Sequence, residues 1–147
     1  MTRKLQLELL AHYPIRDAAS GLNEPSGLAL DRQGTSLYTV SDDTKIIFNL
    51  DLQGRINADT SFLINVNDLE GLAVAADDKT ILAVQEGSNS IIRFNVFSRE
   101  EIQRIPLTTL KNFDQITVYF NHTNQNKGLE GITINFSNND IFVVKEG

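Results

Sequence analysis

The sequence predicts an all-β fold, a β-propeller of four-stranded antiparallel blades that is incomplete, with about two and a half blades present. Three observations predict it. A motif with an acidic residue, a glycine and a short apolar run occurs three times along the chain. Short apolar runs are separated by turn residues at intervals of roughly 8–12 residues. Each complete repeat also has room for four such runs, the strand number of a propeller blade.

The three copies of the motif share more than their first residues. Each glycine is followed after 13 positions by a valine and after 15 positions by an acid. The motif copies are residues 24–30, 68–74 and 128–134. The valines are Val40, Val84 and Val144, and the acids are Asp42, Glu86 and Glu146. Repeats at intervals of about 20–50 residues are typical of solenoids, propellers and arrays. The glycines stand 44 and then 60 residues apart, so the second interval contains extra material.

The first repeat follows an N-terminal stretch, residues 5–15, that alternates between apolar and polar residues and predicts a strand ending at Pro14. Residues 16–23 are polar and predict a loop. Turn residues such as Asp31–Thr35 and Gln53-Gly54 then separate the apolar runs. The strands expected in this repeat are residues 27–30, 37–40, 45–51 and 55–64.

The second and third repeats follow the same pattern. Strands are expected at residues 72–75, 81–84, 90–97 and 102–107, and then at residues 131–136 and 141–144. The repeats therefore lie near residues 24–67, 68–127 and 128–147 of a single partial domain. The third repeat holds two of its four strands, and this predicts a fragment of a longer protein. An open blade exposes unpaired strand edges, so we expect the chain to dimerise, to associate with another chain or to be marginally stable.

The extra material in the second interval agrees with two interpretations. Phe113–Phe120 has the composition of a strand, and residues 121–126 form a polar segment that predicts a loop. Both an added hairpin and a long loop over one end of the propeller agree with this pattern.

The composition excludes several classes of function. The 147 residues carry a net charge of −6, which argues against nucleic acid and anionic lipid as partners. The chain has no cysteine and two histidines, His12 and His122, so a zinc site is not expected. It contains no apolar run long enough to span a membrane. Its first ten residues start basic but are interrupted by Glu8, so they do not read as an export signal.

The acids of the repeat are the candidate functional residues. In an antiparallel hairpin, the residue before the first strand lies beside the residue after the second. Because the first strand of each blade lines the central channel, these acids should gather at one mouth of the channel. Carboxylates so close together repel one another, and Ca²⁺ takes six to eight oxygen ligands of this kind. The sequence therefore predicts a calcium site formed by Glu24, Glu70, Glu130, Asp42, Glu86 and Glu146.

A structural role explains the same acids equally well. A glycine after the acid suits a chain that turns into a crowded inner strand, and the carboxylates can accept backbone hydrogen bonds within turns. Other chemistry has less support. Ser26 lacks the G-x-S-x-G context of a nucleophile elbow. The lysines expected near the mouth would suit a phosphate, but solvated lysines explain them more simply; they are Lys45, Lys127 and Lys145.

With these residues in view, the chain resembles the SdiA-regulated family of bacterial β-propellers. The matching segments occur in the family's order: residues 24–28, 40–43, 51–54, 68–72, 126–131 and 144–146. The resemblance implies a propeller about twice as long as this chain, exported or membrane-associated, and related to esterase-like and phytase-like propellers. It implies no settled biochemical activity. The chain departs from this pattern because it lacks an export signal and a second half.

Three hypotheses about function remain open at this stage. The first is a non-enzymatic, Ca²⁺-binding propeller module of the bacterial envelope that binds a small ligand or a protein across its acidic face. The second is a metal-dependent hydrolase of the lactonase, esterase or phytase kind, in which the bound cation polarises an oxygen of the substrate. The third is a metal-free structural scaffold.

Overall fold

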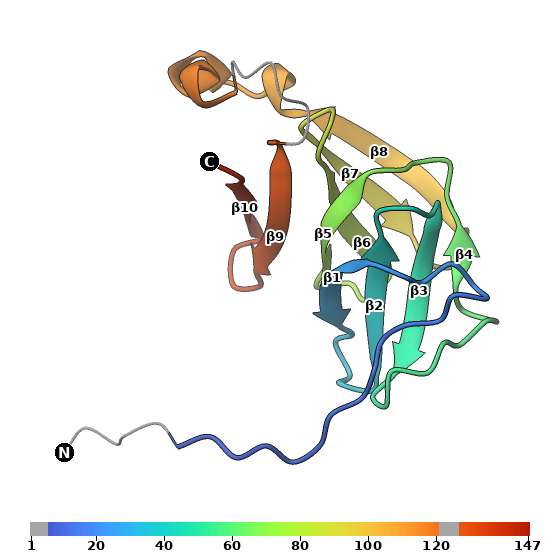
Figure 1. The fold of residues 1–147 in the computed structure, drawn as a ribbon. Coiled ribbons are helices and arrows are strands. Elements are labelled where there is room, and N and C mark those ends of the chain that lie inside the picture. Colours follow the sequence, from blue (N-terminus) through green and yellow to red (C-terminus); the bar gives the residue numbers. More distant parts are fainter. Residues whose placement is uncertain (1–5, 121–126) are drawn as a thin grey trace.

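The computed structural model describes residues 6–120 and 127–147, and in this part of the chain the fold is all-β (Figure 1). Two four-stranded sheets and one two-stranded sheet follow one another along the sequence. The first contains Pro25–Leu30 (β1), Ser36–Ser41 (β2), Ile46–Asp51 (β3) and Phe62–Leu63 (β4). The second contains Leu69–Val74 (β5), Thr80–Gln85 (β6), Ser90–Asn95 (β7) and Glu100–Pro106 (β8). The third contains Leu129–Asn135 (β9) and Asp140–Lys145 (β10).

The sheets are arranged as consecutive blades of a propeller. Within each sheet the strands are antiparallel and are ordered as they occur in the sequence. The first strands of the three sheets lie side by side, with β5 between β1 and β9 (Figure 1). Turn residues such as Asp31 and Asp77 connect the first two strands of a blade. The sheets do not close into a ring within the described residues, as expected for an incomplete propeller.

The main core lies between the first two blades. Alternation of side chains sends Val40 and Ile47 of the first blade toward the second, where Ile81 and Phe94 meet them. All four side chains are at most 1% exposed. The opposite face of the second blade, with Leu82 among its residues, packs toward the third blade. Each middle strand is therefore apolar on both faces, as a strand between two neighbouring blades must be.

The outer face of the first blade is covered by the N-terminal segment. Leu22 packs against Phe48 and Leu50, and all three are fully or almost fully buried. An isolated antiparallel bridge joins Asp17 to Leu22 just before β1. This segment fixes the place at which the chain enters the first blade.

Three expected elements differ from the structure. Residues 6–14 form no strand, because no strand edge lies alongside them in the described part of the chain. The fourth strand of the first blade is reduced to Phe62–Leu63, since Asn57–Ser61 form turns that bond back to Asn57 and Asn49. The third difference concerns Phe113–Phe120.

The segment after β8 is helical instead of extended. It forms three short 3₁₀ turns, Leu107–Thr109, Phe113–Gln115 and Thr117–Tyr119. The rings of Phe113 and Phe120 lie 5.4 Å apart and pack against the core beside Leu129. The apolar composition therefore serves packing, and the prediction of a strand here was wrong. The polar loop expected at 121–126 lies outside the described residues. None of the helical turns described is long and apolar enough to cross a membrane.

Candidate metal centre

The repeated glycines mark the places where neighbouring blades touch through their backbones. A Cβ atom on Gly27 would lie 2.5 Å from the carbonyl oxygen of Glu70. A Cβ atom on Gly71 would lie 2.6 Å from the Cα of Gly131. Contacts this short do not occur between real atoms, so a side chain at either position would push the inner strands apart. The glycines bring β1, β5 and β9 close together, along with the acidic residues beside them.

Each inner strand carries a β-bulge at the position before its glycine. Pro25 pairs with Ser41 and Gly27 with Val40, which leaves Ser26 as the extra residue of β1. The pairing of β9 with β10 likewise shifts between Leu129 and Gly131, and the extra residue is Glu130.

In β5 the register shifts between Leu69 and Leu72, a stretch that contains Glu70. A bulge bends its strand and changes the direction of a side chain. The bulges therefore set the directions of Ser26, Glu70 and Glu130 at one end of the inner strands.

Carboxylates from different blades meet at this end. Three groups each place one oxygen atom per residue within 4.8 Å of the others. The groups are Glu24 with Asp42 and Asp43, Asp42 with Asp68 and Glu70, and Glu86 with Glu130 and Glu146. Asp42 belongs to two groups, and the pKa of Glu70 responds to the charges of Glu130 and Glu86. The groups therefore form one acidic arc across the three blades.

The most enclosed member of the arc is Glu86, which is 7% exposed. Its Oε1 accepts a hydrogen bond of 3.2 Å from the backbone N–H of Gly128. Gly128 lies so close to Glu86 that a Cβ atom there would collide with the backbone of Glu86. Sequence and packing thus hold Glu86 against the loop that leads into β9, beside Glu130.

Asp68 supports the neighbouring loop and also faces the arc. Its carbonyl oxygen accepts a bond of 3.1 Å from the N–H of Glu86, and its Oδ2 accepts one of 2.6 Å from the N–H of Gly87. Its φ angle of 63° lies in the left-handed region, which aspartate tolerates better than most residues. Asp68 therefore links the second blade's two loops at the acidic end.

Burial and like charges shift two of the carboxyl groups. Desolvation raises the pKa of Glu70, as do the charges of Glu130, Asp42 and Glu86, and a hydrogen bond from Ser26 opposes the shift. Desolvation also raises the pKa of Glu130, together with the charge of Glu86 and a hydrogen bond shared with it. The arc thus holds more negative charge than its surroundings accommodate, so it favours either a proton or a cation.

The predicted site residues all lie at this end of the blades, but their partners differ in part from those expected. Glu24 meets Asp42 and Glu130 meets Glu146, as the hairpin geometry predicts. Glu70 and Glu86, in contrast, fall into different groups of the described residues. Glu70 joins Asp42 of the preceding blade, and Glu86 joins Glu130 of the following blade. The close approach of the inner strands therefore adds contacts between acids of neighbouring blades to those within a blade.

Two acids of the arc, Asp43 and Asp68, were not predicted as site residues, and neither was Ser26, which hydrogen-bonds to Glu70. A signal for Asp68 exists in the sequence, because it occupies the same place as Glu24, three positions before the repeat glycine. Among the basic residues, Lys127 Nζ lies 3.9 Å from Glu146 Oε1. Lys145 lies with its Nζ 5.8 Å from the centre of the Phe120 ring, and Lys45 is exposed. His12 is exposed, and His122 lies outside the described residues.

Solved structures support the fold. Glutaminyl cyclase of Myxococcus xanthus aligns with a TM-score of 0.66 and 16% identity, over 84% of this chain and 51% of its own. A streptogramin B lyase aligns with a TM-score of 0.54 and 20% identity, over 82% of this chain and 34% of its own. Both are β-propeller proteins. This chain therefore spans about a third to a half of the length of these structures. No protein of curated function matches it.

The family comparison covers almost the entire chain. The model of the SdiA-regulated family matches residues 6–147, which include all three repeats and every residue of the acidic arc. The repeats, the blade-like sheets and this match agree with one another. The chain belongs to the SdiA-regulated family of β-propellers.

Proposed function

We propose that this chain is a non-enzymatic, calcium-binding propeller module, with the ion held in the acidic arc. The observation that carries the proposal is the group formed by Glu86, Glu130 and Glu146, whose carboxylate oxygens converge within 4.8 Å. Carboxylates are the ligands that Ca²⁺ prefers, and backbone carbonyls and water complete its shell of six to eight oxygens. Desolvation and the charge of Glu86 raise the pKa of Glu130, and a cation there would offset both.

A second ion is proposed at the group of Asp42, Asp68 and Glu70. Both groups lie where loops of neighbouring blades meet, so a bound ion would bridge two blades and hold them together. The arc also leaves exposed oxygens on Asp42 and Glu146, and these supply the acidic face across which a small ligand or a protein would bind. Modules outside the cell bind Ca²⁺ with dissociation constants of about 10⁻⁴–10⁻³ M. This range suits the envelope location that the family resemblance implies.

The binding role is favoured over hydrolysis by the chemistry of the arc. The described side chains of the arc are carboxylates. Beside them lie the Ser26 hydroxyl, which hydrogen-bonds to Glu70, and the Lys127 ammonium group, which is paired with Glu146. A hydrolase needs a general base held toward a nucleophile and donors directed at a developing oxyanion. The arc supports cation binding more directly than it supports such an arrangement.

Calcium titration by calorimetry, joined to thermal melts, tests the proposal. At a free Ca²⁺ concentration of 100 times the dissociation constant, binding adds about 2.7 kcal/mol of stability, equivalent to a shift in melting temperature of about 5–10 °C. Glu130→Gln should remove most of the shift, whereas Glu100→Gln on the outer strand β8 should retain it. A melt indifferent to Ca²⁺ would leave the arc with a structural role. Metal-dependent turnover of a lactone, ester or phosphoester panel would favour the hydrolase instead.

A further inference from the structure

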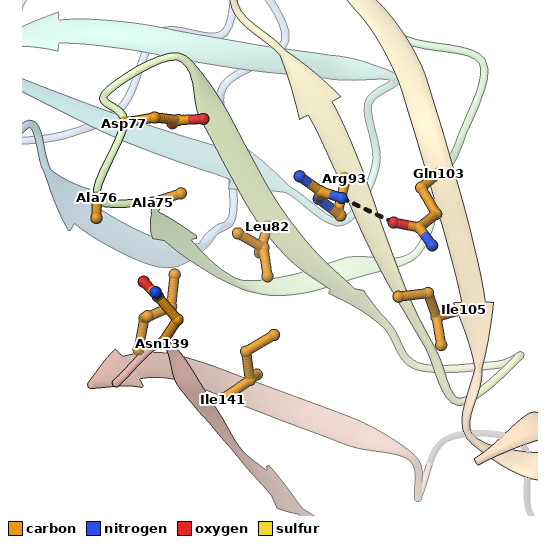
Figure 2. Close-up of a pocket in the computed structure, with 10 residues that line it drawn as sticks. Ala75, Ala76, Asp77, Leu82, Arg93, Gln103, Ile105, Asn139 and Ile141 are labelled. Carbon is orange, nitrogen blue, oxygen red and sulfur yellow. Dashed lines mark hydrogen bonds between the residues drawn. The ribbon is translucent and has the colours of Figure 1, made fainter. Parts of the chain in front are cut away.

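The molecule is hollowed where neighbouring blades meet. The larger hollow, a groove of about 400 Å³, lies between the second and third blades, where Arg93 and Gln103 form a hydrogen bond of 2.8 Å (Figure 2). A smaller cavity of about 200 Å³ lies between the first and second blades, and each of its walls belongs to a four-stranded sheet. The smaller cavity is lined by Tyr38, Thr60, Val96, Phe97 and Arg99.

The smaller cavity lies at the end of the blades opposite to the acidic arc. Residues 96–99 form the turn between β7 and β8, next to Asn95, which pairs with Thr80 at the start of β6. The arc residue Glu86 directly follows the other end of β6. The cavity is therefore separate from the candidate metal centre.

The apolar part of this cavity has a half-buried floor and an exposed rim. Tyr38 and Val96 are half-buried and pack against the core that joins the two blades. Phe97, in contrast, is 72% exposed. An apolar group that entered the cavity would therefore rest on side chains of the core and cover an aromatic ring that is otherwise in water.

A chain of hydrogen bonds holds one polar wall of the cavity in place. The Thr60 hydroxyl donates a bond of 2.8 Å to Asn49 Oδ1, and Asn49 Nδ2 donates one of 3.1 Å to Ser36 Oγ. The Ser36 hydroxyl in turn donates a bond of 2.9 Å to Asp31 Oδ2. Asn49 is 4% exposed and Asp31 is 9% exposed. Because the proton of Thr60 is used within this chain, its oxygen presents only acceptor sites to the cavity.

Arg99 supplies a positive charge at another wall. Its φ angle is 61°, in the left-handed region, which a glycine would adopt at lower cost. Its Nη2 donates a bond of 2.6 Å to the carbonyl oxygen of Asp59, so the arginine joins the turn of the second blade to a loop of the first. That bond uses one of the five N–H donors of a guanidinium group. The planar fork of donors matches the two oxygens of a carboxylate.

The charges near Tyr38 have the opposite sign. Desolvation raises the pKa of Tyr38, and so do the negative charges of Asp78 and Asp31. The tyrosine side of the cavity therefore lies in a negative field, which disfavours a second anion and favours a cation. The acceptor sites of the Thr60 oxygen suit the N–H donors of such a cation. A ligand that satisfies both sides has a carboxylate, an ammonium group and an apolar body.

We propose that the cavity between the first two blades binds a free α-amino acid with an aromatic side chain. The α-carboxylate lies on the fork of Arg99, the ammonium group donates to the Thr60 oxygen, and the ring packs against Phe97. Aromatic rings pair with their centroids about 4.5–7 Å apart. The cavity is smaller than the roughly 300–1,000 Å³ of sites for drug-sized ligands, and this suits a ligand of amino-acid size. The binding is independent of calcium, because the arc lies at the other end of the blades.

Calorimetric titration with L-phenylalanine in EDTA tests this proposal, and the EDTA keeps the result independent of the metal centre. Two analogues test the two charges: L-phenylalanine amide lacks the carboxylate, and 3-phenylpropanoate lacks the ammonium group. L-Phenylalanine should bind about tenfold or more tightly than either analogue, because each analogue loses a charge-assisted hydrogen bond. No binding of L-phenylalanine at millimolar concentration, or an analogue that binds equally well, would overturn the proposal.

Variants locate the binding within the molecule. Arg99→Gln should weaken it about tenfold or more, whereas Arg55→Gln is the matched control, since Arg55 also bonds within a turn, to Asp51, but lies outside the cavity. Phe97→Ala should weaken binding about fivefold and leave the thermal melt unchanged, because this side chain is largely exposed.

The Phe97→Ala variant keeps the test decisive if Arg99→Gln disturbs the fold. Nuclear magnetic resonance gives an independent readout of position. The backbone amide signals of Thr60 and of residues 96–99 should shift during the titration with L-phenylalanine. Shifts confined to the residues of the acidic arc, or an unchanged affinity in Phe97→Ala, would contradict binding in this cavity.

Discussion

Gly71 packs directly against Gly131, and a Cβ atom on Gly71 would lie 2.6 Å from the Cα of its neighbour. This contact joins the inner strands of the second and third blades. It also places Glu70 and Glu130, the residues that precede the two glycines, in the same acidic arc. The repeated acid–glycine pair therefore has two linked roles. The glycine sets the distance between blades, and that distance brings the acid close to the acids of the neighbouring blade.

The variant Gly71→Ala should destabilise the fold by about 1–3 kcal/mol, because an added methyl group forces two backbones apart. The midpoint of urea unfolding measures this loss. Gly147→Ala is the matched control, since a Cβ atom there meets nothing within 4 Å. Equal midpoints for the two variants would show that the inner strands can separate without cost.

In the absence of metal, stability should rise as the pH falls from neutral toward 4.5, the ordinary pKa of a glutamate side chain. Glu70 and Glu130 have raised pKa values in the folded state, so between their ordinary value of 4.5 and the raised value the native state binds more protons than the unfolded state. Stability then falls as the pH rises through that window. At pH values below that window, Asp31 and Asp77 become protonated. Because their pKa values are lowered in the folded state, protonation removes their contribution to the stability of the fold.

Thermal melts in EDTA across this range measure the effect. The variant Glu130→Gln should flatten the pH dependence of stability just above pH 4.5, while Glu100→Gln should leave it unchanged. Under the calcium proposal, Ca²⁺ should remove the decline at higher pH, because the ion binds the ionised carboxylates. A stability that rises steadily as the pH rises above 4.5 in EDTA would contradict the raised pKa values of Glu70 and Glu130.

Glu86→Gln should weaken calcium binding by about tenfold or more, since Ca²⁺ affinity depends on the number of charged ligands. The amide keeps an oxygen that can accept the hydrogen bond from Gly128, so the loop should retain its conformation. Calorimetry gives the affinity, and a melt in EDTA checks the fold. If the affinity is unchanged and the melt is lowered, Glu86 serves the structure alone.

Asp31→Ala should lower the free energy of unfolding by about 2–3 kcal/mol through loss of a turn. The carboxylate of Asp31 accepts four hydrogen bonds of 2.7–3.0 Å from the backbone and hydroxyl groups of Thr35 and Ser36. Although burial raises its pKa, these bonds lower it overall. A hydrogen bond to a charged group contributes about 1.5–3 kcal/mol, and because the four bonds form one network their contributions do not add.

Chemical denaturation at pH 7 measures this loss, with Asp43→Ala, an exposed acid of the next turn, as the comparison. A variant as stable as the wild type would mean that the hydroxyl groups of Thr35 and Ser36 satisfy the turn without the carboxylate.

The sequence by itself determined most strands of the blades, their order, and six of the eight acids of the arc. Strand pairing within a blade is local: turn residues join consecutive runs, and the alternation of apolar side chains sets which face of β6 or β7 is buried. The spacing of the motif therefore also indicated that Glu130 and Glu146 lie side by side. The family resemblance rested on the same residues and was confirmed.

Only the tertiary structure decided which acids meet across blades. Glu86 lies beside Glu130 because Gly71 and Gly131 allow two inner strands to touch. The spacing of residues along the chain does not indicate how far apart two sheets lie. The bulges that direct Glu70 and Glu130 depend likewise on packing. The composition of Phe113–Phe120 predicted a strand, but a tertiary contact replaced strand pairing, and this segment forms 3₁₀ turns that pack over the core. Leu7 and Leu9 form no strand, because no strand lies beside them in the described part of the chain.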